Sequence, residues 1–229
     1  MNNLLISVLY LLLSFLFTML MYKKFGKIGL IVWLSALLII SNIQTVKITE
    51  FIGFSVSLGN TTYGGTFLAT DLLSEKYGKK ESVKAIRLSF IIMIIFCICM
   101  KLFLYFEPNE LNNVQDSLEV IFNYLPRVTI SSLLAYFISQ NIDAYLYCFL
   151  KKHTKKLWIR NFGSTFVSQL LDTIIFTFGA FLFTIPITEI IEIIFTMLVV
   201  KWLIAVVDIP FMYLAVNIKK VSEFWWEDV

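Results

Sequence analysis

Two segments of this chain repeat the same arrangement of polar residues within apolar surroundings. Segments 137–147 and 166–176 are offset by 29 positions, and in each a Ser-Gln pair is followed after two residues by Asp. The matched polar residues are Gln140 with Asp143 and Gln169 with Asp172. A carboxylate in the hydrocarbon region of a membrane is costly unless it is paired, protonated or hydrated. We therefore expect both pairs to face a polar interior, where their oxygens can accept hydrogen bonds from a ligand.

The composition predicts that the elements around these residues are membrane helices. Of 229 residues, 59% are hydrophobic and 15% are charged, whereas a soluble domain is about 45–50% apolar and about 25% charged. We expect an all-α, polytopic integral membrane protein that forms one transmembrane domain over residues 1–229, in the cell membrane of a bacterium (its inner membrane). The net charge of +3 says little about partners, because the basic residues set the topology, and basic runs beside membrane helices more often face lipid headgroups than nucleic acid.

Seven segments can be assigned as spans at about 20 residues per crossing. They are residues 3–22, 28–46, 62–77, 83–106, 126–150, 157–183 and 190–218. The third is short and contains Asp71 and Glu75, so a hydropathy window alone would miss it. A six-span interpretation makes this segment re-entrant, and we therefore expect six to seven transmembrane helices.

The lysines and arginines favour seven crossings. Of 19 basic residues, 15 follow the first, third, fifth and seventh segments, while acidic residues occupy the long connections after the fourth and sixth. Because positive charge is retained on the cytoplasmic side, this pattern places the N-terminus outside and the C-terminus in the cytoplasm. Six crossings would not alternate in this way.

No residue pattern indicates an enzyme or a bound cofactor. A Walker motif, a Rossmann glycine pattern, zinc-ligand spacing and a nucleophile elbow are all missing from the sequence. Cys97, Cys99 and Cys148 fit packing positions within helices, and His153 lies in a basic loop. We expect no catalytic residue, no metal site and no cofactor.

The depth of the carboxylates can be estimated from the rise of about 1.5 Å per helical residue. Counted from the basic ends of their spans, Asp71, Asp143, Asp172 and Asp208 share one layer between the midplane and the cytoplasmic face. If the two matched helices are antiparallel neighbours, Gln140 is level with Asp172 and Gln169 with Asp143. The repeat then predicts two crossed Gln–Asp pairs.

Alternative interpretations of these polar residues are structural. Gln and Asp side chains can hold membrane helices together, at around 0.6–2 kcal/mol for each hydrogen bond. Arg127 fits either the outer interface or a substrate contact, and Arg160 fits both a topology signal and a gate. Four carboxylates at one depth favour a polar cavity.

Three blocks of the sequence resemble a known family. The run from Asp71 through Glu75 to Lys80 is similar to the D-x-x-x-E-x-Y-G-K-K signature of the YhhQ-like queuosine precursor transporters, also called the vitamin uptake transporter family. Ser41-Asn42 resembles an upstream segment of that family. Residues 127–143 and 160–172 resemble its second and third blocks.

The resemblance implies import of 7-deazaguanine bases, such as pre-queuosine bases or queuine, for salvage into tRNA modification. A guanine-type edge offers N–H donors that a carboxylate accepts, and aromatic faces can stack on the flat ring. Substrate contacts are then expected from Asn42, Phe67, Asp71, Glu75, Arg127, Tyr136, Gln140, Asp143, Arg160, Gln169 and Asp172. The preferred base, proton coupling or facilitated diffusion, and a homodimer are left open.

Two other classes of protein are weighed against a transporter that acts alone. The first is the substrate-binding subunit of an energy-coupling-factor vitamin importer, which would need an ATPase pair and a scaffold subunit. The second is an intramembrane enzyme, which would need a histidine or a reactive cysteine with a base at the depth of the carboxylates. The sequence places neither there.

Overall fold

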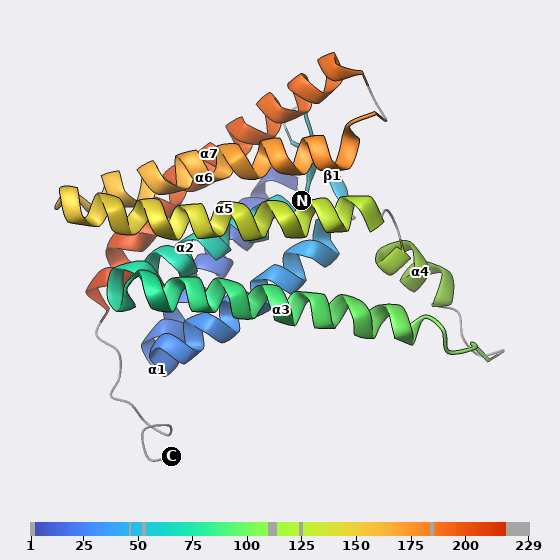
Figure 1. The fold of residues 1–229 in the computed structure, drawn as a ribbon, viewed down its shortest axis with the longest axis horizontal. Coiled ribbons are helices and arrows are strands. Elements are labelled where there is room, and N and C mark those ends of the chain that lie inside the picture. Colours follow the sequence, from blue (N-terminus) through green and yellow to red (C-terminus); the bar gives the residue numbers. More distant parts are fainter. Residues whose placement is uncertain are drawn as a thin grey trace.

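The computed structural model describes residues 3–45, 47–51, 54–109, 114–123, 126–183 and 186–218. Its long helices lie side by side as a bundle (Figure 1). The helices are α1 (Asn3–Thr45), α2 (Gly59–Tyr77), α3 (Lys79–Phe103), α4 (Gln115–Asn123), α5 (Pro126–His153), α6 (Leu157–Phe181) and α7 (Ile187–Asn217). Every predicted span falls on one of these helices, and the first two share α1.

A single glycine divides α1 into two halves. Gly26 has φ 57° and ψ −131°, whereas its neighbours are helical. Side chains with a Cβ rarely adopt a positive φ, so glycine is suited to this bend. The halves correspond to the first and second predicted spans, and Lys23, Lys24 and Lys27 surround the bend.

The long helices have the length and surface of membrane spans. Four segments are long and apolar enough to cross a membrane, namely Leu5–Thr45, Lys79–Phe103, Leu157–Phe181 and Ile187–Asn217. Large apolar side chains on their outer faces are more than half exposed, as at Leu5, Ile95 and Leu203. Lipid contact accounts for this surface, which would be unfavourable in water. The chain is therefore a polytopic helical membrane protein.

The helix α2 lies in the interior of the bundle. It packs against α1, α3, α5 and α7, and its residues from Thr66 to Ser74 are all buried. Several of them are polar, which explains why α2 is missing from the apolar spans. The helix ends at Gly78, whose φ of 82° and ψ of 170° belong to a region that is essentially restricted to glycine. The next residue begins α3.

The bundle is helical as predicted, and one connection adds a short hairpin. Strands β1 (Ile48–Phe51) and β2 (Phe54–Ser57) form an antiparallel hairpin between α1 and α2, with Ile48 opposite Ser57. Both strands are rich in β-branched and aromatic residues, which favour extended pairing. The predicted spans include neither this connection nor the short helix α4.

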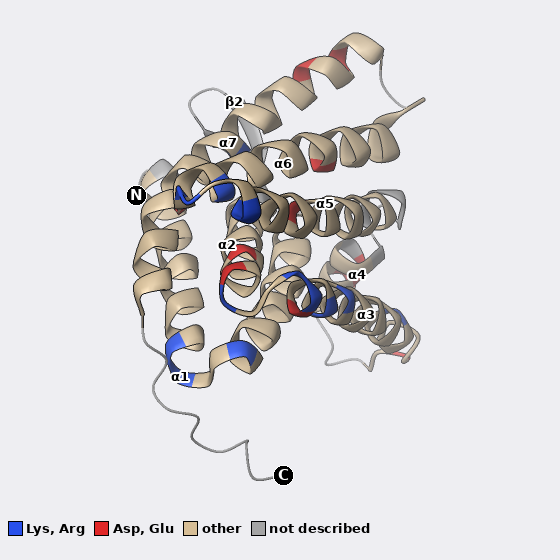
Figure 2. Cartoon of the chain, turned by 60° about the vertical axis from the view of Figure 1, so that its left-hand side comes forward, with Lys and Arg blue, Asp and Glu red and all other residues tan. Residues whose placement is uncertain are grey.

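Basic residues gather at one end of the bundle (Figure 2). They surround the bend of α1 and the connections from α2 to α3 and from α5 to α6. Contacts confirm that these regions meet, because Lys27 forms an ion pair with Glu81 at 3.1 Å and Lys151 pairs with Glu75 at 3.4 Å. The hairpin lies toward the other end of the bundle, because it connects the C-terminal end of α1 to the N-terminal end of α2, and both lie away from the basic residues.

Candidate functional site

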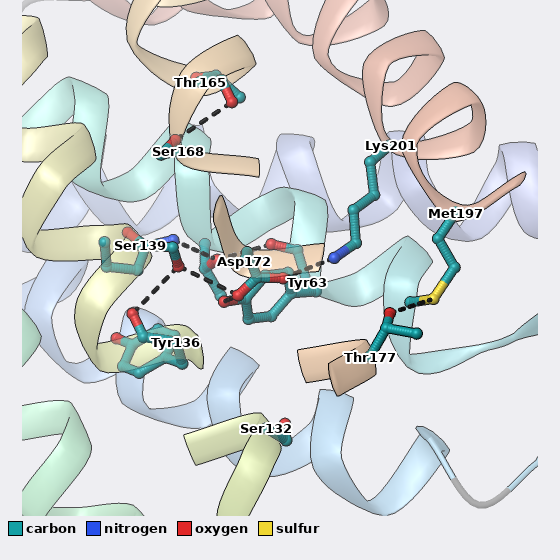
Figure 3. Close-up of polar contacts among 12 residues, drawn as sticks. Tyr63, Ser132, Tyr136, Ser139, Thr165, Ser168, Asp172, Thr177, Met197 and Lys201 are labelled. Carbon is teal, nitrogen blue, oxygen red and sulfur yellow. Dashed lines mark hydrogen bonds and ion pairs between the residues drawn. The ribbon is translucent and has the colours of Figure 1, made fainter. Parts of the chain in front are cut away.

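Four helices bring a charged cluster together, and its side chains point toward one another (Figure 3). The Asp172 carboxylate on α6 accepts hydrogen bonds from the Tyr63 hydroxyl on α2 (2.8 Å) and the Ser139 hydroxyl on α5 (3.1 Å). The Lys201 ammonium on α7 lies 2.6 Å from the other Asp172 oxygen. We call Tyr63, Ser139, Asp172 and Lys201 the pocket cluster.

The pocket cluster forms part of the wall of an open pocket. About 440 Å³ of space not filled by protein atoms lies there, and this volume includes space open to the surroundings. The lining residues are Ser41, Thr45, Gly59, Tyr63, Ser132, Ala135, Asp172, Phe176, Met197 and Lys201. Several of them lie near the hairpin, so the pocket is on the side of the bundle away from the basic end.

A second cluster contains three carboxyl groups. The side-chain amide of Asn161 donates to Asp71 (2.6 Å) and to Asp208 (3.0 Å). Asp71 also approaches Asp143 closely enough for the two carboxyls to share a hydrogen bond when one is protonated. We call Asp71, Asp143, Asn161 and Asp208 the acidic cluster. All four are buried, and no ion pair between the described residues neutralises them.

A third cluster closes the basic end. Glu75 accepts from the Arg160 guanidinium at 2.6 Å and from the Tyr147 hydroxyl at 3.0 Å, and Lys151 lies 3.4 Å away. We call Glu75, Tyr147, Lys151 and Arg160 the basic-end cluster. Along α2 and α5 the pocket cluster comes first, then the acidic cluster, then the basic-end cluster. The helix α6 runs antiparallel to α5, so its residues follow the reverse order in sequence and the same order in space. The three clusters therefore form a polar path through the bundle.

The repeated motif makes crossed contacts, but with different partners from those predicted. Ser139 donates to Asp172, and Ser168 donates to Asp143 at 2.9 Å. The predicted pairs of Asp172 with Gln140 and of Asp143 with Gln169 are wrong in register by one residue. A step of one residue turns a helix by about 100°, so the serine beside each glutamine faces the other helix instead.

The structure also divides the predicted layer of four carboxylates. Asp71, Asp143 and Asp208 lie together, whereas Asp172 belongs to the pocket cluster with Lys201. Counting from the basic residues ignored how far each helix extends past the membrane before its first charge. The two groups differ in charge, since only Asp172 has a described cationic partner.

The other predicted contact residues lie around these clusters without lining the pocket. Phe67 and Tyr136 are buried and pack edge-on against Tyr63, with ring centroids 5.6 and 6.1 Å away. The Gln140 amide donates to Thr66 at 3.1 Å. Asn42 donates to the Leu38 carbonyl and accepts from Ser132. The side chain of Arg127 lies outside the described part of the structure.

Seven cluster members were not predicted as substrate contacts, namely Tyr63, Ser139, Tyr147, Lys151, Asn161, Lys201 and Asp208. Of these, Asp208 was placed in the predicted layer of carboxylates, and Asn161 was noted only as part of a resembling block. Lys201 had a detectable signal, because it is an isolated cation within the apolar run from Ile193 to Val207. A charge inside a membrane span indicates a functional interior whether it is basic or acidic.

Some buried polar atoms of the interior lack a hydrogen-bond partner among the described residues. Six of them are carboxylate or amide oxygens, at Asp71 Oδ1, Gln140 Oε1, Asp143 Oδ2, Asn161 Oδ1, Gln169 Oε1 and Asp208 Oδ1, and the others are the hydroxyls of Ser14, Ser74 and Thr173 and the donors Arg160 Nε and Trp202 Nε1. Native proteins leave few buried polar atoms unpaired, so such a group requires an explanation. A ligand that supplies donors would satisfy these oxygens.

A membrane bundle with a pocket toward one end, ion pairs closing the other and carboxyls between them defines a small-molecule membrane transporter. The chain belongs to the family described as "Putative vitamin uptake transporter", whose profile matches residues 57–215. The resemblance found in the sequence is therefore confirmed.

One relative is similar over nearly the whole chain. It is described as "Probable queuosine precursor transporter" from Bacillus subtilis (strain 168), and it is 40% identical over 211 residues. The match covers 91% of this chain and 92% of the relative. No solved structure matches the chain.

Proposed function

We propose that this chain imports queuosine precursors, which are 7-deazaguanine bases salvaged for tRNA modification. The observation that carries the proposal is the group of buried carboxylate and amide oxygens that have no donor among the described residues. A guanine-type edge presents a ring N–H and an exocyclic amine, and carboxylate and amide oxygens accept both. The relative described as "Probable queuosine precursor transporter" supports this class of substrate, and the family description supports uptake of a small molecule.

The clusters suggest how import proceeds. The base enters the pocket toward the hairpin end, meets the pocket cluster first and then reaches the free oxygens of the acidic cluster. The ion pairs of Glu75 must open before the base leaves at the basic end. The proposed cycle consists of binding the base and opening the ion pairs of Glu75. It requires no described side chain to act as a nucleophile, so we infer transport rather than catalysis.

We also propose seven crossings, with the N-terminus outside and the C-terminus in the cytoplasm. The two halves of α1 supply two crossings, because its apolar 41 residues would extend about 60 Å if straight, twice the hydrocarbon thickness of about 30 Å. The helices α2, α3, α5, α6 and α7 supply the rest. The cluster of lysines and arginines at one end supports a cytoplasmic position for that end.

Uptake by whole cells tests the proposed function. Cells unable to synthesise 7-deazaguanines, and lacking their own importer, should accumulate a labelled pre-queuosine base when this chain is expressed alone. Absence of uptake despite normal membrane levels would contradict the proposal. Uptake that requires a co-expressed ATPase pair and scaffold subunit would instead favour the energy-coupling-factor alternative.

A further inference from the structure

The pocket contains one acidic and one basic side chain among its described lining residues, and the two are partners. Asp172 and Lys201 form an ion pair of 2.6 Å, and both retain only a few per cent of their exposure. Figure 3 shows the Lys201 side chain extending from α7 toward Asp172. A ligand in the pocket would therefore meet a hydrogen-bond donor directly beside an acceptor.

Stability alone is a weak reason for this pair. Replacing a buried ion pair with apolar residues of similar volume is often neutral or stabilising, because two charges must lose their hydration. A lysine in the middle of an apolar helix is therefore better explained by contact with a ligand than by a structural role.

Both side chains have hydrogen-bonding capacity left. A carboxylate offers about four lone-pair positions, and Tyr63, Ser139 and Lys201 occupy three on Asp172. A lysine has three N–H donors, and Asp172 is the hydrogen-bond acceptor that the structure gives it. The pair can thus still accept one hydrogen bond and donate two.

We infer that Lys201 binds the ring carbonyl of the base while Asp172 accepts the adjacent ring N–H, an inference that rests on the proposed function. In a guanine-type ring the carbonyl oxygen lies beside the N–H, so acceptor and donor match the ammonium and the carboxylate. An adenine-type ring carries an amine at the carbonyl position, which would place a donor against the lysine. Lys201 is therefore a specificity-determining residue that selects a carbonyl-bearing base.

Removing either partner of the contact between Lys201 and the ring carbonyl tests this assignment. Binding to purified protein in detergent is measured by calorimetry for 7-deazaguanine and for 6-thio-7-deazaguanine, which keeps the ring N–H but has sulfur, a weak acceptor, in place of the carbonyl oxygen. Wild-type protein should bind the second base roughly ten-fold more weakly, as expected when a hydrogen bond to a charged group is weakened. Lys201→Met should bind both bases with similar affinity. Met197→Leu, an apolar change in the same pocket, should keep the wild-type ratio.

A second variant keeps the test valid if the Lys201→Met protein does not fold. Lys201→Met leaves the Asp172 carboxylate without its cation, so the D172N/K201M double variant, which has no charge in this pair, is measured alongside. It should also show no preference for the carbonyl-bearing base. A folded variant without Lys201 that keeps the wild-type ratio would overturn the inference.

The outcomes separate the inference from the function. Wild-type protein that binds both bases equally well would refute the role of Lys201 and leave the proposed function intact. Wild-type protein that binds neither base, although it is folded, would refute the proposed function and the inference with it.

Discussion

Asp143 and Asp172 occupy equivalent positions in the repeated motif, yet their surroundings differ in charge. Each accepts a hydrogen bond from the serine of the other segment. The difference comes from α7, which places Lys201 beside Asp172 and Asp208 in the cluster that contains Asp143. One carboxylate is therefore neutralised by a fixed cation, whereas the other adjoins further carboxyls. We infer that Asp172 orients the base and that the oxygens of the acidic cluster bind a hydrogen-bond donor or a cation.

At the residue scale, we expect Asp172→Asn and Lys201→Met each to destabilise the protein more than the double variant does. Each single change leaves one buried charge unpaired, which typically costs about 3–5 kcal/mol, and the double change removes both charges. Thermal unfolding of the purified protein in detergent measures the difference.

Glu81→Gln is the control for these stability measurements. It breaks partly exposed ion pairs with Lys27 and Lys84, and such pairs contribute about 0–1 kcal/mol. Single variants of Asp172 or Lys201 that unfold at the wild-type temperature would show that the pair is not buried as described.

At the scale of elements, α2 connects all three clusters. Tyr63, Asp71 and Glu75 lie along this one helix, and neighbouring helices supply a partner for each. The spacing of Asp71 and Glu75 places them one turn apart, about 6 Å along the axis, on one face of the helix. The structure assigns them to different clusters, with the deeper carboxyl hydrogen-bonded to an amide and the other paired with an arginine.

We expect Glu75→Gln to slow uptake several-fold while the affinity for a 7-deazaguanine changes by less than about two-fold. Glu75 does not line the pocket, but its charge holds Arg160 and Lys151 at the basic end. Initial uptake rates and calorimetric binding separate the two effects. Glu81→Gln, at the same end of the bundle, should change neither. Loss of binding in Glu75→Gln would place this residue in the substrate site instead.

At the scale of the whole molecule, the distribution of charge and of polar groups defines a direction. The pocket lies away from the basic end, and the ion pairs of Glu75 lie at it. If the basic end faces the cytoplasm, as we propose, the pocket lies toward the outside and the ion pairs of Glu75 toward the inside.

The orientation predicts which side chains an external reagent can reach. In a background without Cys97, Cys99 and Cys148, a cysteine at exposed Glu107 should react with a membrane-impermeant thiol reagent on intact cells. A cysteine at exposed Lys80 should react only after permeabilisation. Labelling of Lys80→Cys from outside would reverse the proposed topology.

The sequence alone determined the long helices and the class of protein, and among the cluster residues it singled out Asp71, Glu75, Asp143, Arg160 and Asp172 as contacts. Apolar length, and at α2 the pattern of charges, located these helices because lipid contact and basic ends leave local signals. The antiparallel register of α5 and α6 was predicted to within one residue from counts of helical rise. The hairpin was not predicted, because the only criteria applied to this connection were those for a membrane span.

Only the tertiary structure decided which polar residues meet. A helix position one residue away points in a direction about 100° different, so the choice between Ser139 and Gln140 as the partner of Asp172 depends on the packing of α5 against α6. The ion pair with Lys201 depends on where α7 crosses α6, which no local pattern encodes. The charge of each carboxylate's surroundings, and with it the division between pocket cluster and acidic cluster, is therefore a property of helix packing.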